Sequence, residues 1–117
     1  MDSFDHEKLD VYQTAVDWVS LAQDIAEALP RGKGNLADQL QRASSSITLN
    51  IAEGAGEFSG AEKARFYRIA KRSATECAAI LDVAQRRSSI SREHYAQGRS
   101  LLLRIVGMLV KLARSHT

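Results

Sequence analysis

The sequence is organised around the stretch Gln39-Leu-Gln-Arg-Ala-Ser-Ser-Ser-Ile-Thr-Leu-Asn-Ile-Ala-Glu-Gly-Ala-Gly-Glu-Phe-Ser-Gly60. Its first part continues an apolar stripe at helical spacing, which consists of Leu36, Leu40, Ala43, Ile47 and Ile51. Serine, threonine and asparagine residues interrupt this stripe, and such residues compete for backbone hydrogen bonds. Because the local helix propensity is weak, the segment needs packing from its neighbours. The two glycines that follow predict that a narrow, partly polar helix ends in a sharp reversal.

Length and composition favour one small helical domain. The chain has 117 residues, of which 44% are hydrophobic and 26% are charged, and this fits a single soluble domain over 1–117. The single cysteine, Cys77, excludes an internal disulfide and fits a reducing cytoplasm. Residues 1–30 lack the pattern of a secretory signal, and Arg104 and Lys111 break the last apolar cluster. We therefore expect a cytoplasmic protein that does not enter a membrane.

The periodicity predicts four helices with short connections. Their expected bounds are residues 10–29, 35–55, 59–87 and 91–115, and residues 1–8 are expected to be loose. The run from Pro30 to Gly34 ends the first helix, because a proline disfavours helical geometry in the residue before it. Four helices joined in this way predict an all-α, up-down-up-down antiparallel four-helix bundle.

Apolar residues define the inner face of each long helix. The first helix presents Val11, Ala15, Trp18, Ala22, Ile25 and Leu29, and the third presents Phe66, Ala70, Ser73, Cys77, Ile80 and Ala84. The fourth helix carries apolar residues on more than one side, including Leu101, Leu103, Val106, Met108 and Val110. Since only one side of this helix faces the core, the other side is a candidate subunit interface.

The sequence offers no set of residues for catalysis. Its three histidines form no Glu-x-x-His pair, and the chain has no zinc-protease, phosphate-loop or dinucleotide motif. Cys77 lies on an inner stripe and is interpreted as a small core residue, not a nucleophile. We therefore expect neither enzymatic activity nor a cofactor or metal ion.

Polar residues at the junction of the second and third helices form a structural polar motif. It consists of Arg42, Asn50, Glu53, Gly54, Ser73 and Glu76. Antiparallel pairing about residues 57–58 places Arg42 opposite Ser73 and predicts an Arg42–Glu76 ion pair. Asn50 and Glu53 are expected to fix the turn through backbone N–H groups, since buried polar groups need partners. The alternative is a small polar ligand site at this place.

Charge is unevenly distributed along the chain. Residues 1–30 hold seven acids and one base, a net −6, so a whole-chain charge of +2 leaves +8 on the remainder. Such a split is typical of nucleic-acid contact, of complementary surfaces in an oligomer, or of an uneven solvated surface. The predicted nucleic-acid-binding set, for RNA or DNA, is Arg65, Arg68, Lys71, Arg72, Arg86, Arg87, Arg99, Arg104 and Lys111.

These residues together resemble the four-helix-bundle proteins encoded in intervening sequences of bacterial 23S ribosomal RNA genes. The segments that carry the resemblance are Gln39-Leu-Gln-Arg42-Ala43, Ser46-Ile47 and Asn50-Ile-Ala-Glu-Gly54, flanked by Leu9, Val11-Tyr12-Gln13, Ala15, Leu29-Pro30, Phe66, Ile69-Ala70, Ser73 and Glu76. The resemblance covers roughly residues 4–115. Two departures are Arg72, where the family usually has glycine, and Cys77, where leucine is common.

The resemblance implies an up-down bundle that assembles into a homopentamer without known catalytic activity. Accessory proteins of diversity-generating retroelements share the architecture and bind a reverse transcriptase and nucleic acid. The first hypothesis is therefore a non-enzymatic oligomer that binds RNA or a ribonucleoprotein through helices three and four. The alternatives are a retroelement accessory subunit, with reverse transcriptase as its partner, and a purely structural or protein-interaction module.

Overall fold

The computed structural model describes residues 2–30 and 35–117. A short 3-10 helix, η1 (Asp5–Lys8), precedes α1 (Asp10–Ala28), α2 (Leu36–Gly56), α3 (Gly60–Arg86) and α4 (Arg92–Ser115). The bounds of the four α-helices lie within one residue of those expected from the sequence. The N-terminal segment is more regular than expected, because Glu7 accepts a hydrogen bond from the backbone N–H of Phe4 at 2.9 Å.

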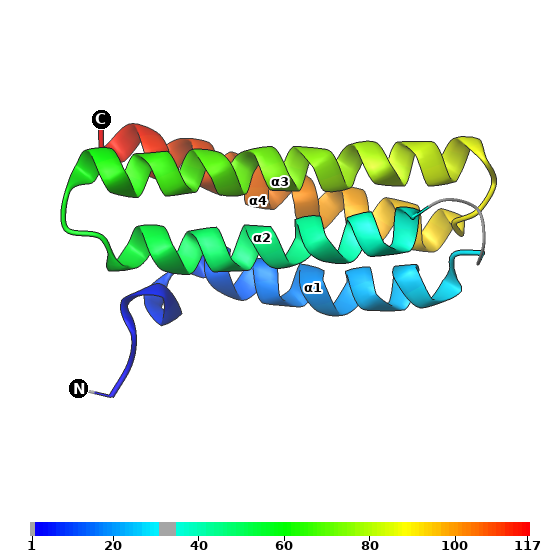
Figure 1. Ribbon diagram of the computed structural model, residues 1–117, viewed down its shortest axis with the longest axis horizontal. Helices are drawn as coiled ribbons and strands as arrows, with labels where there is room; N and C mark the ends of the chain where they lie inside the picture. Colours follow the sequence, from blue (N-terminus) through cyan, green and yellow to red (C-terminus); the bar gives the residue numbers. More distant parts are fainter. Residues whose placement is uncertain (1, 31–34) are drawn as a thin grey trace.

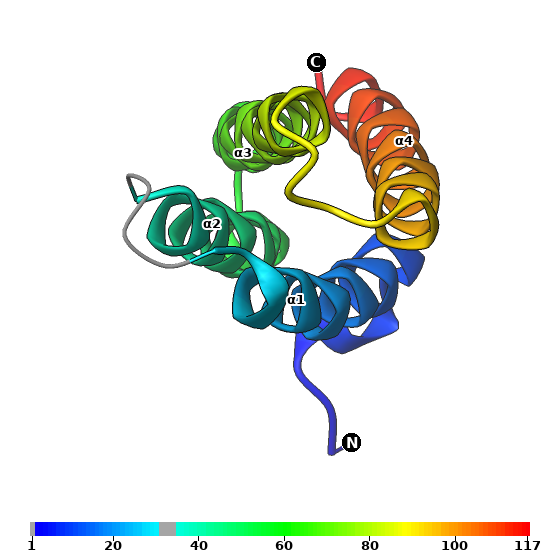
Figure 2. The same cartoon turned by 90° about the vertical axis from the view of Figure 1, so that its right-hand side faces the viewer.

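The four α-helices run lengthwise and alternate in direction (Figure 1). Seen along the bundle, they occupy the corners of a square, in which α1 and α3 lie on one diagonal and α2 and α4 on the other (Figure 2). Each helix packs on its two neighbours. Within the described ranges, the backbones of the diagonal pairs α1–α3 and α2–α4 are not in contact. The prediction of an all-α, up-down-up-down four-helix bundle is confirmed.

The core follows the apolar stripe of α1. All six residues expected on its inner face are buried, and Trp18 is completely enclosed. Gly98 of α4 makes room for this indole, because a Cβ atom there would lie 3.1 Å from Trp18 Cζ3 and 2.8 Å from Leu81 Cδ1. Burial of large apolar side chains supplies the main stabilisation of such a bundle.

The inner face of α3 differs from the prediction at its first turns. Phe66 is only half-buried, whereas Tyr67 has a relative solvent exposure of 2% and belongs to the core. Gly54 of α2 explains the difference, because a Cβ atom there would lie 2.8 Å from Tyr67 Cε1. The missing side chain leaves the space that the Tyr67 ring occupies, and the inner stripe passes through Tyr67 instead of Phe66.

Serine side chains cap the N-termini of two of the helices. Ser59 accepts a hydrogen bond from the backbone N–H of Glu62, and Ser91 accepts one from that of His94, each at 3.0 Å. Asn35 stands at the N-cap of α2, but its side chain makes no capping hydrogen bond. The expected turn from Pro30 to Gly34 falls mostly outside the described residues; Leu29, before the proline, is extended. No helix in residues 2–30 and 35–117 is long and apolar enough to span a bilayer.

Candidate nucleic-acid interface

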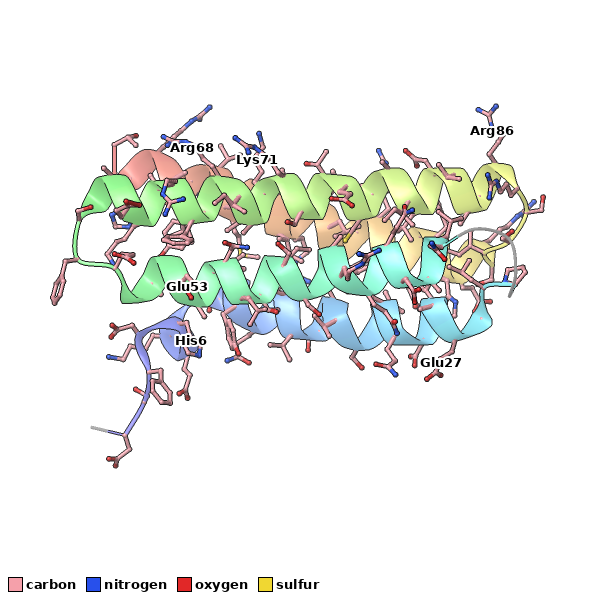
Figure 3. All side chains as sticks on the ribbon, in the orientation of Figure 1. His6, Glu27, Glu53, Arg68, Lys71 and Arg86 are labelled. Atoms are coloured by element: carbon pink, nitrogen blue, oxygen red, sulfur yellow. The ribbon has the colours of Figure 1, made fainter. Side chains whose placement is uncertain are left out.

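The charge split in the sequence becomes a split between faces of the bundle. Helix α1 holds four acids and no base, whereas α3 holds six bases and three acids and α4 holds five bases and one acid. Together α3 and α4 therefore carry +7 against −4 on α1. Arg68, Lys71 and Arg86 point away from one long edge of the molecule, and Glu27 and His6 lie along the opposite edge (Figure 3).

Five of the six bases of α3 project from its outer side, here called the outer α3 face, and the exposed acids Glu76 and Asp82 lie between Arg72 and Arg86. Its members are Arg65, Arg68, Lys71, Arg72 and Arg86, and all five are exposed. Arg65, Arg72 and Arg86 recur at multiples of seven residues, so they project in the same direction from a helix packed in a bundle. Arg87 is exposed at the C-cap, where α3 ends.

Arg65 differs from the other bases of this face because its guanidinium is held in place. Its Nε donates to Glu62 Oε2 at 2.6 Å, and its Cζ atom lies 4.4 Å from the centroid of the Phe66 ring. The pair is exposed and adds little stability, but it offsets part of the charge of Arg65. Arg68, Lys71 and Arg72 are therefore the freest cations at the centre of the face.

The predicted bases of α4 divide between two sides. Gln97 lines a shallow groove with Leu21 of α1, and Arg104 and Lys111 follow it at intervals of seven residues. They consequently lie on the α1 side of α4, toward the acidic helix. Arg99 lies four residues after Tyr95, whose hydroxyl donates to Asp82 of α3 at 2.8 Å, and thus on the α3 side. The nine predicted residues do not converge on one surface, and the outer α3 face with Arg99 is their largest group.

The predicted Arg42–Glu76 ion pair is wrong. Both side chains are exposed, and the ion pair found in the described part of the chain joins Arg65 to Glu62 instead. The register between α2 and α3 differs from the expected one: Ser73 Oγ donates to Ser46 Oγ at 2.8 Å, so Ser46 and not Arg42 faces Ser73.

The end of α4 packs close to the start of α3. A Cβ atom at Gly60 would lie 2.8 Å from the carbonyl oxygen of His116, which shows that the first turn of α3 packs on the end of α4. The Ser46–Ser73 register implies that this turn extends beyond the end of α2. Pairing between α2 and α3 begins later in α3 than a symmetric reversal about residues 57–58 predicts.

The turn is fixed by Lys63, which the sequence analysis missed. Lys63 Nζ donates to the carbonyl oxygens of Ala55 at 2.8 Å and of Gly54 at 3.4 Å. It thereby provides hydrogen-bond donors for carbonyl groups at the end of α2, which have no partner within the helix. Asn50 instead donates to Ser46, to its backbone oxygen at 2.8 Å and to its Oγ at 3.1 Å. Glu53 is exposed and makes no hydrogen bond in the described structure. The prediction that Asn50 and Glu53 bind backbone N–H groups of the turn is wrong.

A buried polar contact joins three helices at the centre of the bundle. Trp18 Nε1 donates to Ser44 Oγ at 2.9 Å, and Ser44 Oγ lies 3.6 Å from Cys77 Sγ. Burial raises the pKa of the Cys77 thiol to about 11, and the hydrogen bonds from Ser44 and Trp18 only partly oppose this effect. A fully buried thiol with this pKa is a core residue, as predicted, and lacks the thiolate that a nucleophile needs.

The remaining hollows suit surface contact better than catalysis. A shallow open groove is lined by Asp38, Gln41, Arg42, Ser45, Ser46, Leu49 and Asn50, all from α2. It presents no buried wall that would enclose the small polar ligand considered above. In residues 2–30 and 35–117, no three histidine, cysteine, aspartate or glutamate residues lie close enough to hold a metal ion.

Comparison with known proteins identifies the family. A family model of the 23S rRNA-intervening sequence protein matches residues 7–111. The chain belongs to the family of 23S rRNA-intervening sequence proteins. The matched range of this intervening-sequence protein includes every residue of the outer α3 face and of the structural polar motif.

A solved structure shares the bundle of this intervening-sequence protein. It is the crystal structure of a protein of unknown function from the S23 ribosomal protein family of Bacteroides thetaiotaomicron. The two superpose with a TM-score of 0.82 at 22% sequence identity, over 88% of this chain and 97% of the other. At this identity the similarity concerns the fold. A search of curated proteins gave no match.

Proposed function

We propose that this intervening-sequence protein is a cytoplasmic, oligomeric and non-enzymatic protein that binds RNA through its outer α3 face. The observation that supports the proposal is the exposure of Arg68, Lys71 and Arg72 on one side of a helix that faces away from acidic α1. Phosphates are attracted to such a row of bases without any need for a shaped pocket. The family name describes where the genes of such proteins lie and does not by itself assign an RNA ligand.

The number of bases gives the proposal a quantitative form. If Arg68, Lys71 and Arg72 each neutralise one phosphate, log K should fall with log salt with a slope of about −2 per protomer for single-stranded RNA. An assembly that aligns several outer α3 faces multiplies this slope. A contact dominated by apolar side chains would show almost no salt dependence.

The outward side of α4 supplies a candidate surface for assembly. Leu103, Gly107 and Val110 follow one another at spacings of four and three residues, as in a coiled-coil seam, and Ala96 and Ser100, which continue the pattern, line the groove beside Leu21 of α1. Leu103 is 59% exposed, and a Cβ atom at Gly107 would meet nothing within 4 Å. This outer α4 seam supports the proposal that copies of the chain pack together, and the resemblance proposes a pentamer.

Binding of RNA is tested by a matched pair of double variants. Arg68→Gln/Arg72→Gln removes two bases from the outer α3 face, and Lys8→Gln/Arg42→Gln removes two exposed bases from elsewhere. Fluorescence anisotropy with labelled RNA at increasing salt should show weaker binding and a slope reduced by about 1.4 for the first variant only. Equal losses in both variants would mean that net charge alone governs binding. Absence of binding at low salt would refute the proposal.

Assembly is tested separately by light scattering. Leu103→Glu places a charge in the outer α4 seam and should dissociate the oligomer. Val83→Glu, at a 40% exposed apolar residue of α3, is the control and should leave the assembly intact. A wild-type protein that remains monomeric at low salt would remove the proposed interface. A reverse transcriptase partner stays a prediction of the resemblance, since no described residue favours it over RNA.

A further inference from the structure

The connection between α2 and α3 carries an aromatic ring that the fold does not use. Phe58 is fully exposed, with a relative exposure of 103%, between Glu57 and Ser59. The local structure of the turn depends on other groups: Ser59 caps α3, and Lys63 closes α2. The Phe58 ring makes no ring contact within the described residues. A side chain with this exposure adds no buried apolar area to the fold and is accessible from outside the molecule.

Phe58 lies at the end of the basic surface. Helix α3 begins at Gly60, and Arg65 is the first member of the outer α3 face. Five helical residues and two connecting residues separate the Cα atoms of Phe58 and Arg65 by at most about 15 Å. The α2–α3 connection and the C-terminus share this end of the bundle (Figure 1). Helix α1, which carries four acids, lies diagonally across the bundle from α3 (Figure 2), whereas Glu57 and Glu62 lie close to Phe58 in the chain.

The guanidinium of Arg65 adds a second planar surface. It is fixed over the Phe66 ring at 4.4 Å and by its hydrogen bond to Glu62. Nucleic-acid bases stack both on exposed aromatic rings and on guanidinium planes, and their phosphates pair with neighbouring bases of the protein. Only an unpaired base can present its face to such a ring, because bases within a duplex are stacked on each other.

We propose that the ligand of the outer α3 face is RNA with unpaired nucleotides, and that one unpaired base stacks on Phe58 while the adjoining phosphates contact Arg65, Arg68 and Arg72. The inference rests on the proposed RNA binding and adds the class of RNA to it. Charge complementarity decides between occupants of this apolar tip. A membrane-bound surface would need a row of apolar side chains, whereas Phe58 is a single exposed ring, and the exposed bases of the outer α3 face begin at Arg65, beyond Glu57 and Glu62.

The test compares two RNA probes and two phenylalanine variants. The probes are a hairpin with an unpaired loop and a fully paired duplex with the same number of phosphates. Phe58→Ala removes the proposed stacking surface, and Phe58→Trp restores it. Phe4→Ala is the matched control, because Phe4 is 72% exposed but lies in the acidic N-terminal segment. Thermal unfolding checks that all variants fold.

Phe58→Ala should weaken binding of the hairpin about 5- to 140-fold, with no change in salt slope or in binding of the duplex. Phe58→Trp and Phe4→Ala should bind both probes as the wild type does. Unchanged hairpin binding by Phe58→Ala, with weakened binding by Arg68→Gln/Arg72→Gln, would overturn this inference alone. If neither probe binds the wild type at low salt, the proposed function fails with it. Loss of the oligomer in Phe58→Ala would assign Phe58 to a second copy and overturn the inference.

Discussion

Trp18 of α1 donates its indole N–H to the hydroxyl of Ser44 of α2 at 2.9 Å, where both side chains are almost completely buried. The serine run of α2 thus provides a partner for the largest side chain of the core. Without this hydroxyl the indole nitrogen would be enclosed by apolar groups. The polar character of α2 therefore serves packing at this position.

Ser44→Ala should lower the free energy of unfolding by about 1–3 kcal/mol, because it leaves the indole N–H buried without an acceptor. Urea unfolding measures the change. Ser45→Ala, at an exposed position of the same helix, is the control and should lie within about 0.5 kcal/mol of the wild type. Equal stability of the two variants would show that Trp18 finds another acceptor.

Gly54→Ala should destabilise the protein by about 1–3 kcal/mol, because the new Cβ atom would meet Tyr67 Cε1 at 2.8 Å and Phe66 Cβ at 3.1 Å. Gly56→Ala is the matched control in the same helix. A Cβ atom there meets nothing within 4 Å, so this variant should be neutral or more stable by up to about 1 kcal/mol. Opposite signs in thermal unfolding would distinguish close packing from helix propensity, and equal signs would contradict the packing.

Lys63→Met should cost about 0.5–1 kcal/mol, because the carbonyl groups of Gly54 and Ala55 lose a cationic donor at the end of α2. Lys71→Met removes an exposed lysine from the same helix and should change stability by less than about 0.5 kcal/mol. Glu53→Ala should likewise change stability by less than about 0.5 kcal/mol. A larger loss in Glu53→Ala than in Lys63→Met would reinstate the glutamate as the residue that fixes the turn.

Alkaline pH should lower the free energy of unfolding of the wild type, because the Cys77 thiol ionises more readily in the unfolded state. Burial raises the pKa of this thiol from 9.0 to about 11, so the folded state keeps a proton that the unfolded state loses. The stabilisation is complete below pH 9.0 and is lost as the pH rises toward 11. The total effect is roughly 3 kcal/mol.

Urea midpoints of the wild type and of Cys77→Ala, measured on both sides of pH 9, test this dependence. The variant lacks the thiol and should lose less stability between the two pH values. A parallel decline of both proteins would assign the effect to other groups, such as Tyr67, whose pKa is also raised by burial.

The positions of the helices could be predicted from the sequence because core residues recur at regular spacings along each helix. The stripe from Val11 to Leu29 alternates spacings of four and three, and all its members are buried in the bundle. Phe66 shows where this method fails. Both Phe66 and Tyr67 suit an inner stripe of α3, and the choice depends on the space left by Gly54 in another helix.

The candidate site was less accessible because it depends on contacts between helices. The basic residues themselves are evident from the sequence, but the side of α4 on which Arg104 and Lys111 lie follows from the packing of Gln97 near Leu21. Likewise the role of Lys63 arises from the closeness of two helix ends. Phe58 carried no periodic signal at all, and only its exposure in the folded chain distinguishes it.

The opposed charges of α1 and α3 also have a kinetic consequence. A polyanion that approaches the bundle is attracted over the side of α3 and repelled over the side of α1, so the field turns the protein before the two touch. If the outer α3 face binds RNA as proposed, association is faster than random collision of the correct faces would permit, and this advantage disappears as salt is added.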